Sequence, residues 1–327
     1  MEKQLAMALL PRWPEEYSIH QYLASLPDAE FTGLGSESAA RIAAWSLTSG
    51  MLPVQCEGIE GIVTCTPRHV VDRELIRQGK EYSGVFTITS HFKGGKRSFK
   101  KTGTAFAVNK FHVLTSAHLM FDLKLGPAKS AFLLPDERQG RYWDRGMPCV
   151  AVACHANHIK IPEQKGRRAE NDFCMLAVAD AFNSGVRIFK CHNEPSSFDY
   201  KDGLIVGFPK DMPDNSPGKH LISSKGSMCC SEKDDVLSIN HMINTEEGNS
   251  GSPIIINNLV VGVHSRFLAA KGCNAAAPVN RNGNRIDDFS AALCYMRGQP
   301  AEFHQGGRVL ESARGVTHPG DVLTLFT

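Results

Sequence analysis

The amino-acid sequence predicts an all-β fold of closed antiparallel sheets, and two observations support this prediction. Apolar and polar residues alternate in short runs typical of strands, as in residues 85–89 and 104–108. Gly, Asn and Asp stand between these runs, where hairpin turns favour them. The chain has 327 residues, and domains commonly hold about 100–200 residues. We therefore expect two successive β domains.

Two groups of predicted strands follow each other along the chain. The first group begins near Tyr82, and the second ends in a hairpin whose turn is Asn257-Asn258. Each group is long enough to bury a core of its own. The predicted strands are residues 85–89, 104–108, 112–115, 204–208, 221–228, 236–244, 254–256 and 259–264.

Residues 1–79 precede these strands as an extension of mixed α/β character. Residues 36–47 are typical of a helix with Ser36 as its N-cap, and residues 54–66 are suited to one or two short strands. Two interpretations of the extension remain open: a pro-segment or regulatory element, or a structural elaboration packed on the β domains. We expect residues 298–327 to form a C-terminal tail.

Composition and charge narrow the class of protein. With 42% hydrophobic and 21% charged residues the chain is ordinary for a globular protein, so wholesale disorder is excluded. The formal net charge of +2 gives no reason to expect nucleic acid or an anionic membrane as partner. A local basic cluster surrounds a Gly-Gly pair, and we interpret it as a solvated hairpin tip. It consists of Lys93, Lys96, Arg97, Lys100 and Lys101.

The N-terminus does not match a secretory signal. Its apolar run, residues 5–10, is shorter than the ~7–15 apolar residues of a signal peptide and is ended by Pro11. No stretch approaches the ~18 apolar residues of a membrane-spanning helix. We therefore expect a cytoplasmic protein, with secretion by another route left open.

The ten cysteines do not form a metal-binding pattern. Cys174 lies in an apolar strand pattern, where a free cysteine behaves as a small hydrophobe. Cys56 and Cys65 lack the close spacing of a metal knuckle, and the adjacent Cys229 and Cys230 rarely serve two ligands of one metal. We predict no metal and no other cofactor.

A serine loop over residues 246–253 (EEGNSGSP) leads into the predicted hairpin. A nucleophilic hydroxyl must project from a tight turn, and the backbone N–H groups beside it must point at a developing oxyanion. Glycines permit both because they tolerate unusual φ angles and a close approach of substrate. Alone, the loop is equally typical of a Gly/Ser-rich hairpin turn.

Two further segments supply partners for this serine. Residues 115–118 (TSAH) place His118 in a small-residue corner after a strand, and residues 171–176 (NDFCML) place Asp172 at the mouth of another. The order along the chain is His118, Asp172, Ser250, with separations of 54 and 78 residues.

In this order and spacing, TSAH, NDFCML and GNSGSP resemble the three catalytic segments of the chymotrypsin-like serine endopeptidases. The resemblance covers residues 80–297 and implies a protease domain of two antiparallel six-stranded β-barrels that meet at a cleft. Residues 207–213 (GFPKDMP) and Asn249 are similar to the V8-like glutamyl endopeptidase branch. Leu119 stands where the trypsin branch has a cysteine, which agrees with a reducing compartment.

The resemblance implies a role for each matching residue. Ser250 attacks the scissile carbonyl, His118 takes its proton and later gives it to the leaving amine, and Asp172 orients and stabilises the imidazole. The backbone N–H groups of Gly248 and Ser250 form the oxyanion hole. The substrates are proteins or peptides, and the sequence leaves the oligomeric state unknown.

The same resemblance suggests a preference for glutamate at the P1 position of the substrate. Thr245 and His264 stand where V8-like enzymes bind the glutamate side chain, and a hydroxyl and an imidazole can receive a carboxylate. Asn244 replaces the aspartate with which trypsin-like enzymes hold basic residues. Glu246 and Glu247 depart from the branch, and their carboxylates near the pocket rim would repel an acidic side chain.

Arg266, two residues after His264, could offset that repulsion or contact substrate. Asn249 carries no charge, so it cannot be the anionic partner of a newly cleaved amino terminus as in trypsin-like zymogens. Release or displacement of residues 1–79 is one alternative route of activation. A hypothesis of a different class is a catalytically silent peptide-binding module on the same fold.

Overall fold

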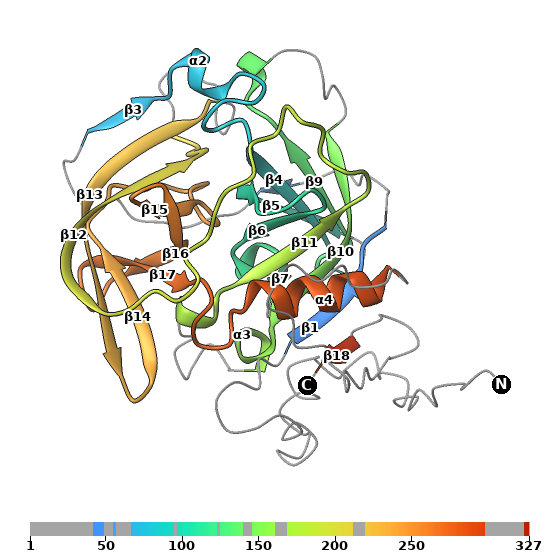
Figure 1. Ribbon diagram of the computed structural model, residues 1–327. Coiled ribbons are helices and arrows are strands. Elements are labelled where there is room, and N and C mark those ends of the chain that lie inside the picture. The colour runs from blue at the N-terminus through green and yellow to red at the C-terminus, as the bar shows by residue number, and fades with distance from the viewer. Residues whose placement is uncertain are drawn as a thin grey trace.

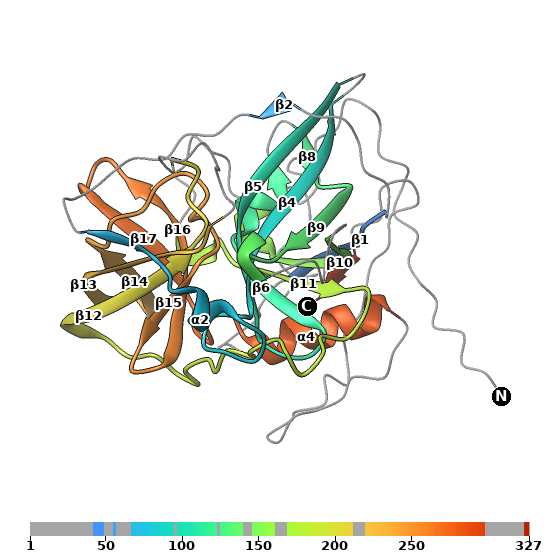
Figure 2. The same ribbon diagram turned by 90° about the horizontal axis from the view of Figure 1, so that it is seen from above.

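The computed structural model of the protein describes residues 42–48, 55–56, 67–94, 97–122, 125–139, 146–160, 169–211, 220–297 and 324–326. Within these ranges the chain folds into two β-barrels that lie side by side, with short helices at their margins (Figures 1 and 2). None of the helices in these ranges has the length and apolar character needed to cross a membrane. Predictions for residues 1–41 lie outside the described part of the chain.

The first barrel is a closed antiparallel ring of six strands. Each strand pairs with the next, and the last returns to the first, so the ring has no open edge. In ring order the strands are β4 (Val85–Gly94), β5 (Arg97–Ala107), β6 (His112–Thr115), β11 (Cys174–Val178), β10 (Met147–His155) and β9 (Ser130–Leu134).

The second barrel repeats this arrangement. It contains the predicted hairpin, in which Asn257 and Asn258 have φ angles of 49° and 63°, the values that a tight two-residue hairpin turn requires. In ring order its strands are β12 (Phe198–Gly207), β15 (Pro253–Ile256), β16 (Leu259–Leu268), β17 (Cys273–Pro278), β14 (Val236–His241) and β13 (Ile222–Lys233), which returns to β12. The predicted fold of two six-stranded barrels is confirmed.

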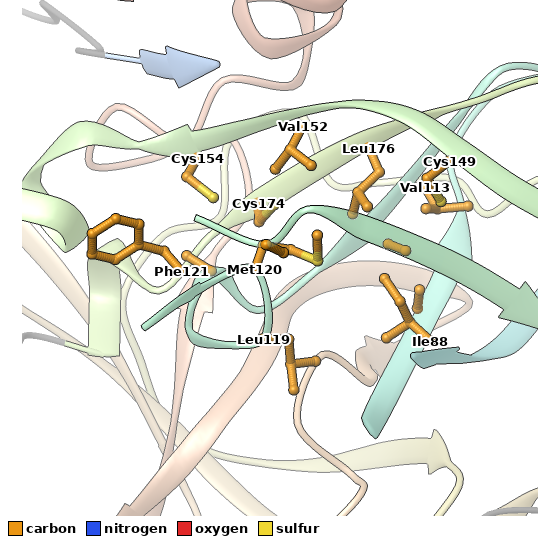
Figure 3. Packing of buried hydrophobic residues seen from close by; sticks show 14 of the residues in the cluster. Ile88, Val113, Leu119, Met120, Phe121, Cys149, Val152, Cys154, Cys174 and Leu176 are labelled. Carbon is orange, nitrogen blue, oxygen red and sulfur yellow. The ribbon is translucent and has the colours of Figure 1, made fainter. Parts of the chain in front are cut away.

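Each barrel has its own core. Ile88, Val113 and Leu176 belong to the core of the first barrel, part of which Figure 3 shows, and this core also holds the thiols of Cys154 and Cys174. Cys174 is fully buried, as its apolar strand pattern predicts, and burial raises its pKa well above the ordinary value. Every cysteine whose side chain the structure describes is free.

A third buried cluster joins the two barrels. Phe106 of β5 belongs to this cluster, whereas its neighbours Ala105 and Ala107 face the first barrel's interior, as strand alternation requires. Phe208, just after β12, contributes from the second barrel, and Phe289 packs edge-on against Phe173, just before β11. Because this interface is closely packed and apolar, both barrels restrict the positions of residues at its edge.

The helices and remaining short strands lie around the barrels. Helix α4 covers the interface cluster through Phe289, and α3 follows β10 directly. These elements are α2 (Arg73–Ile76), α3 (Ala156–Lys160), α4 (Ile286–Met296), β7 (Phe121–Asp122), β8 (Gly126–Pro127) and 3-10 turns at Ala117–Leu119, Glu137–Gln139 and Ala169–Asn171.

The helix predicted over residues 36–47 is wrong for Ile42–Ser46, which form strand β1; the first part of that prediction lies outside the described residues. Strand β1 pairs with β10 on one side and with β18 (Thr324–Phe326) on the other. Ala43 and Trp45 enter the first core, while Ile42 and Ala44 join the interface cluster. Burial on both faces of a strand thus overrides the helical propensity of the alanines.

Two more strands come from residues 1–79. Strand β2 (Gln55–Cys56) pairs in parallel with β5, and β3 (Arg68–Val70) pairs with β13 of the second barrel. The described parts of the predicted extension therefore extend the sheets of both barrels. In the predicted C-terminal tail, the described residues are likewise a strand, β18.

Candidate active site

His118 lies in the 3-10 turn that follows β6, at the junction of the barrels. Its backbone N–H donates to Asp172 Oδ1 at 2.8 Å, and its Nδ1 lies 2.6 Å from Asp172 Oδ2. An ionised carboxylate can only accept, so Nδ1 carries the proton and Nε2 is left as the basic nitrogen. The His118 side chain is 28% exposed, which leaves it accessible from the solvent side.

Asp172 is fully buried just before β11. Besides the two bonds from His118, its carboxylate accepts a bond of 2.5 Å from the hydroxyl of Ser265. Burial alone would raise its pKa, but the charges of His118 and His158 and the hydrogen bond from His118 hold the pKa well below the ordinary value. The aspartate is therefore ionised at neutral pH.

His158 was not among the residues predicted from the sequence. It lies in α3 with its Nδ1 3.5 Å from Asp172 Oδ1, and its side chain is only 1% exposed. Two histidines thus face one carboxylate. A lone histidine in a short helical segment carries no pattern by which the sequence could have revealed this contact.

Ser250 sits in the turn before β15 and is buried. Its Oγ donates to the carbonyl oxygen of Ser265 at 3.2 Å, and the hydroxyl of the same Ser265 donates to Asp172. Ser265 of β16 therefore binds Ser250 through its backbone carbonyl and Asp172 through its hydroxyl. The predicted His, Asp and Ser are brought together at the junction of the barrels.

Both barrels fix the turn that carries Ser250. The carbonyl of Ser250 accepts from Thr104 N in the first barrel at 2.8 Å, and Gly251 N donates to His264 O in the second at 2.8 Å. Gly251 has φ +88°, and a Cβ there would lie 2.1 Å from the carbonyl oxygen of Thr104. Only glycine fits this position, which explains the residue after the serine.

Gly248, predicted to supply an oxyanion donor, is held just as tightly. It has φ +100°, and a Cβ would lie 2.3 Å from the carbonyl oxygen of Phe208. The hydroxyl of Thr104 donates to Gly248 O at 2.8 Å and accepts from Phe208 N at 3.0 Å. Thr104 therefore orients the peptide unit that follows Gly248, which leads towards Ser250.

Thr245 and His264, the predicted specificity residues, are both buried. His264 Nδ1 lies 3.1 Å from Nε2 of His241, a residue of β14 that sequence reasoning missed. Burial, with a smaller contribution from His118, lowers the pKa of His264 to about 3, and burial lowers the pKa of His241 well below its ordinary value. Both imidazoles are neutral at pH 7.

The predicted repulsion from Glu247 is offset by a cation. Its carboxylate pairs with Lys210 Nζ, and its carbonyl accepts from Lys210 N at 2.7 Å. The charge of Glu246 acts on Arg68. Arg266 acts on Asp172, whose pKa its charge lowers. Each of the two glutamates therefore has a basic neighbour.

One residue of the predicted basic cluster also belongs to this region. Lys101 Nζ donates to the carbonyl oxygen of His118 at 2.9 Å and pairs with Asp122 at 2.8 Å. The interpretation of the cluster as a solvated hairpin tip is therefore wrong for Lys101. Lys96 lies outside the described residues. Among the residues that the structure does describe, no group of three or more His, Cys, Asp or Glu side chains is arranged to hold a metal ion.

Comparison with known proteins bears on the family and the fold of the chain. A model of the family described as Trypsin matches residues 76–283, well over half of the chain. No curated protein matches the chain. A solved structure of a Glu endopeptidase in complex with MPD is similar with a TM-score of 0.52 and 15% identity, covering 73% of this chain and 98% of that one. At this identity the likeness shows the fold alone.

Two other solved structures are similar at a lower score. A protease from M. tuberculosis in its active form has a TM-score of 0.42 and 16% identity, covering 69% of this chain and 86% of that one. A scabies mite inactivated protease paralogue has a TM-score of 0.42 and 18% identity, with coverage of 64% and 94%.

Proposed function

Because the chain belongs to the trypsin family of serine proteases, we propose that it is an endopeptidase that cleaves proteins or peptides through His118, Asp172 and Ser250. The main support is the doubly hydrogen-bonded His118–Asp172 pair, joined to Ser250 through Ser265. In that arrangement the imidazole has a fixed tautomer and a buried anion behind it.

The proposed reaction has two halves. Ser250 Oγ attacks the scissile carbonyl while its proton passes to His118 Nε2, and the imidazolium then protonates the leaving amine. A water molecule attacks the resulting acyl-enzyme, with His118 again acting as the base. Asp172 stays ionised throughout and stabilises the imidazolium. No metal or cofactor is needed for these steps.

The oxyanion hole is proposed to consist of the backbone N–H groups of Gly248 and Ser250. The bond from Lys210 N to Glu247 O fixes the peptide unit that carries the Gly248 N–H, and Phe208 and Thr104 confine Gly248 from the other side. These constraints support the role, because donors fixed before the reaction need no reorganisation when charge develops. Losing one such donor typically costs ~10²–10³ in rate.

The proposed P1 preference is for glutamate, bound by Thr245 and His264. Both imidazoles of the His241–His264 pair are neutral, and we propose that His241 donates to His264 Nδ1, which directs the Nε2–H of His264 at the substrate. A glutamate carboxylate would accept from that N–H and from the Thr245 hydroxyl. Pairing of Glu247 with Lys210 removes part of the repulsion that such a substrate would meet.

Incubation with a peptide library, followed by mass spectrometry of the products, tests both levels of the proposal. We expect cleavage mainly after Glu by the wild type and none by Ser250→Ala. Cleavage mainly after apolar residues would overturn the glutamate preference and keep the protease. Absence of cleavage by a folded wild type, with peptides retained by it, would favour the silent peptide-binding module.

A further inference from the structure

Residues 68–76, here called the strap, run from the second barrel to the first. In Figure 1 the strap is the cyan segment that contains β3 and α2, at the top of the molecule. Its β3 lies on β13 with Arg68 opposite Ser224. At its other end Leu75 O accepts from Tyr82 N, just before β4. The strap therefore connects the two barrels.

Hydrogen bonds attach the middle of the strap to both sides. Val71 N donates to Leu221 O of the second barrel at 2.9 Å, and Val71 O accepts from Arg138 Nη1 of the first at 2.9 Å. Arg138 in turn pairs with the buried Asp136, which accepts from Leu221 N at 2.7 Å. Because these bonds form a closed network across the interface, the position of the strap is well defined.

Arg68 extends from the strap to the loop beside the proposed oxyanion hole. Its guanidinium forms two bonds to Asp211, 2.7 Å from Nη1 to Oδ1 and 2.5 Å from Nη2 to Oδ2. A bidentate pair of this kind fixes orientation as well as distance. The hydrogen bond to Asp211 raises the pKa of Arg68, and the charge of Glu246 adds to this effect.

The loop held by Arg68 is packed directly against Gly248. Lys210, the residue before Asp211, binds Glu247 through its backbone N–H and its ammonium group. The carbonyl of Phe208 lies so close to Gly248 that no Cβ fits between them. A shift of residues 208–211 would therefore move the peptide that carries the Gly248 N–H.

We infer that Arg68 is a positioning residue for the oxyanion hole, acting through Asp211 and Lys210 on Gly248. This inference rests on the proposed protease function. It assigns to the strap an activating role, in which a bond within the chain orders the loop that carries Gly248. Release of residues 1–79 would remove Arg68, so the strap must remain with the barrels for full activity.

The pair stabilises the fold as well, because its geometry is bidentate. The Arg68 and Asp211 side chains are 23% and 32% exposed, so solvent screening limits that contribution. We therefore expect the loss of Arg68 to lower the catalytic rate with only a small fall in the thermal midpoint. Because the oxyanion forms in the transition state, the effect falls on kcat and spares KM.

The test uses the full chain with Arg68→Ala, Asp211→Ala, the double variant and the charge exchange Arg68→Asp with Asp211→Arg. Arg77→Ala is the matched control, because Arg77 lies just beyond the strap and pairs only locally, with Glu74. We expect each single variant to lower kcat about tenfold with KM within about twofold, since loosening a donor costs less than its removal. The double variant should be no worse than the single ones, and the charge exchange should recover much of the loss.

An unchanged kcat in Arg68→Ala would overturn the inference, and so would losses of kcat that add in the double variant. In both cases an active wild type would leave the proposed function intact. A rise in KM without a fall in kcat would also overturn it, by assigning Arg68 to substrate binding. A wild type without activity would overturn the proposed function and this inference with it. Thermal unfolding of every variant separates a positioning effect from a loss of folding.

Discussion

Two histidines at the junction of the barrels, His118 and His264, each contact a second ionisable side chain, and the two partners differ in charge. His118 is partly exposed and has the buried, ionised Asp172 at 2.6 Å. His264 is fully buried and has the neutral His241 at 3.1 Å. The anion beside His118 would stabilise its imidazolium, whereas burial disfavours the charged form of His264. We propose that one residue type thus serves here as a base and there as a substrate ligand, according to its partner.

Replacing the anion of the first pair should have the largest effect. Asp172→Asn keeps the size of the side chain but removes the charge and favours the wrong tautomer of His118. We expect a fall in kcat of about 10⁴ at pH 7, as this exchange gives in related triads. Steady-state kinetics on the best peptide from the library measure it. A loss below tenfold would mean that Asp172 is not the partner of the catalytic base.

Removing the imidazole of His264 should alter the choice of P1 residue more than the rate of the chemical step. His264→Gln keeps a polar side chain but loses the imidazole N–H, and a hydrogen bond to a charged group is worth about 1.5–3 kcal/mol. We expect kcat/KM to fall about 10–100-fold for peptides with Glu at P1 and much less for peptides with Gln there. Equal losses for both peptides would contradict a role in carboxylate recognition.

His241 should matter less than His264, because we propose that it contacts substrate only through its neighbour. His241→Asn keeps a donor near His264 Nδ1, whereas His241→Phe removes it. We expect kcat/KM for Glu peptides to fall about tenfold in the Phe variant, the cost of one lost hydrogen bond. The Asn variant should lie between this value and the wild type. Identical kinetics for both variants would remove the proposed orientation of His264.

The neutral state of His264 should also make the stability of the protein depend on pH. The pKa of His264 is about 3 in the folded protein and 6.5 as its ordinary value, so between these values the unfolded chain binds the extra proton. The stability contribution is complete above about pH 6.5 and is lost as pH falls towards 3.

Urea unfolding at pH 7 and pH 4.5 measures this loss. We expect the decrease in the free energy of unfolding to be smaller by about 2–3 kcal/mol in His264→Gln than in the wild type. His69→Gln, at an exposed position of β3, serves as the control and should keep the wild-type decrease. Equal decreases in His264→Gln and wild type would show that folding does not lower the pKa of His264.

Sequence reasoning could find the candidate triad because each member lies in a contiguous segment with local constraints. Gly251, for example, has no room for a Cβ, and this constraint leaves a readable pattern around Ser250. His158, Ser265 and His241 reach the same region only through the closure of the barrels, which brings distant strands together. Nothing beside them in the sequence marks that contact.

Elements of the fold were likewise predictable only where a local constraint marks the sequence. The Asn257-Asn258 hairpin was predictable because its turn needs two positive φ angles. Strand β1 was not, because its Ala-rich sequence favours a helix and only burial between two clusters makes it a strand. The pairing of Arg68 with Asp211 joins residues 143 positions apart, which no local pattern anticipates.

Fluorophosphonate labelling of the full chain, with the modified residue identified by mass spectrometry, tests directly whether Ser250 is an activated nucleophile. An activated serine reacts with this probe, and an ordinary buried hydroxyl does not. We expect one adduct, on Ser250, that disappears in Ser250→Ala and forms far more slowly in His118→Ala. A folded wild type that remains unlabelled, or carries its adduct on another residue, would contradict this expectation.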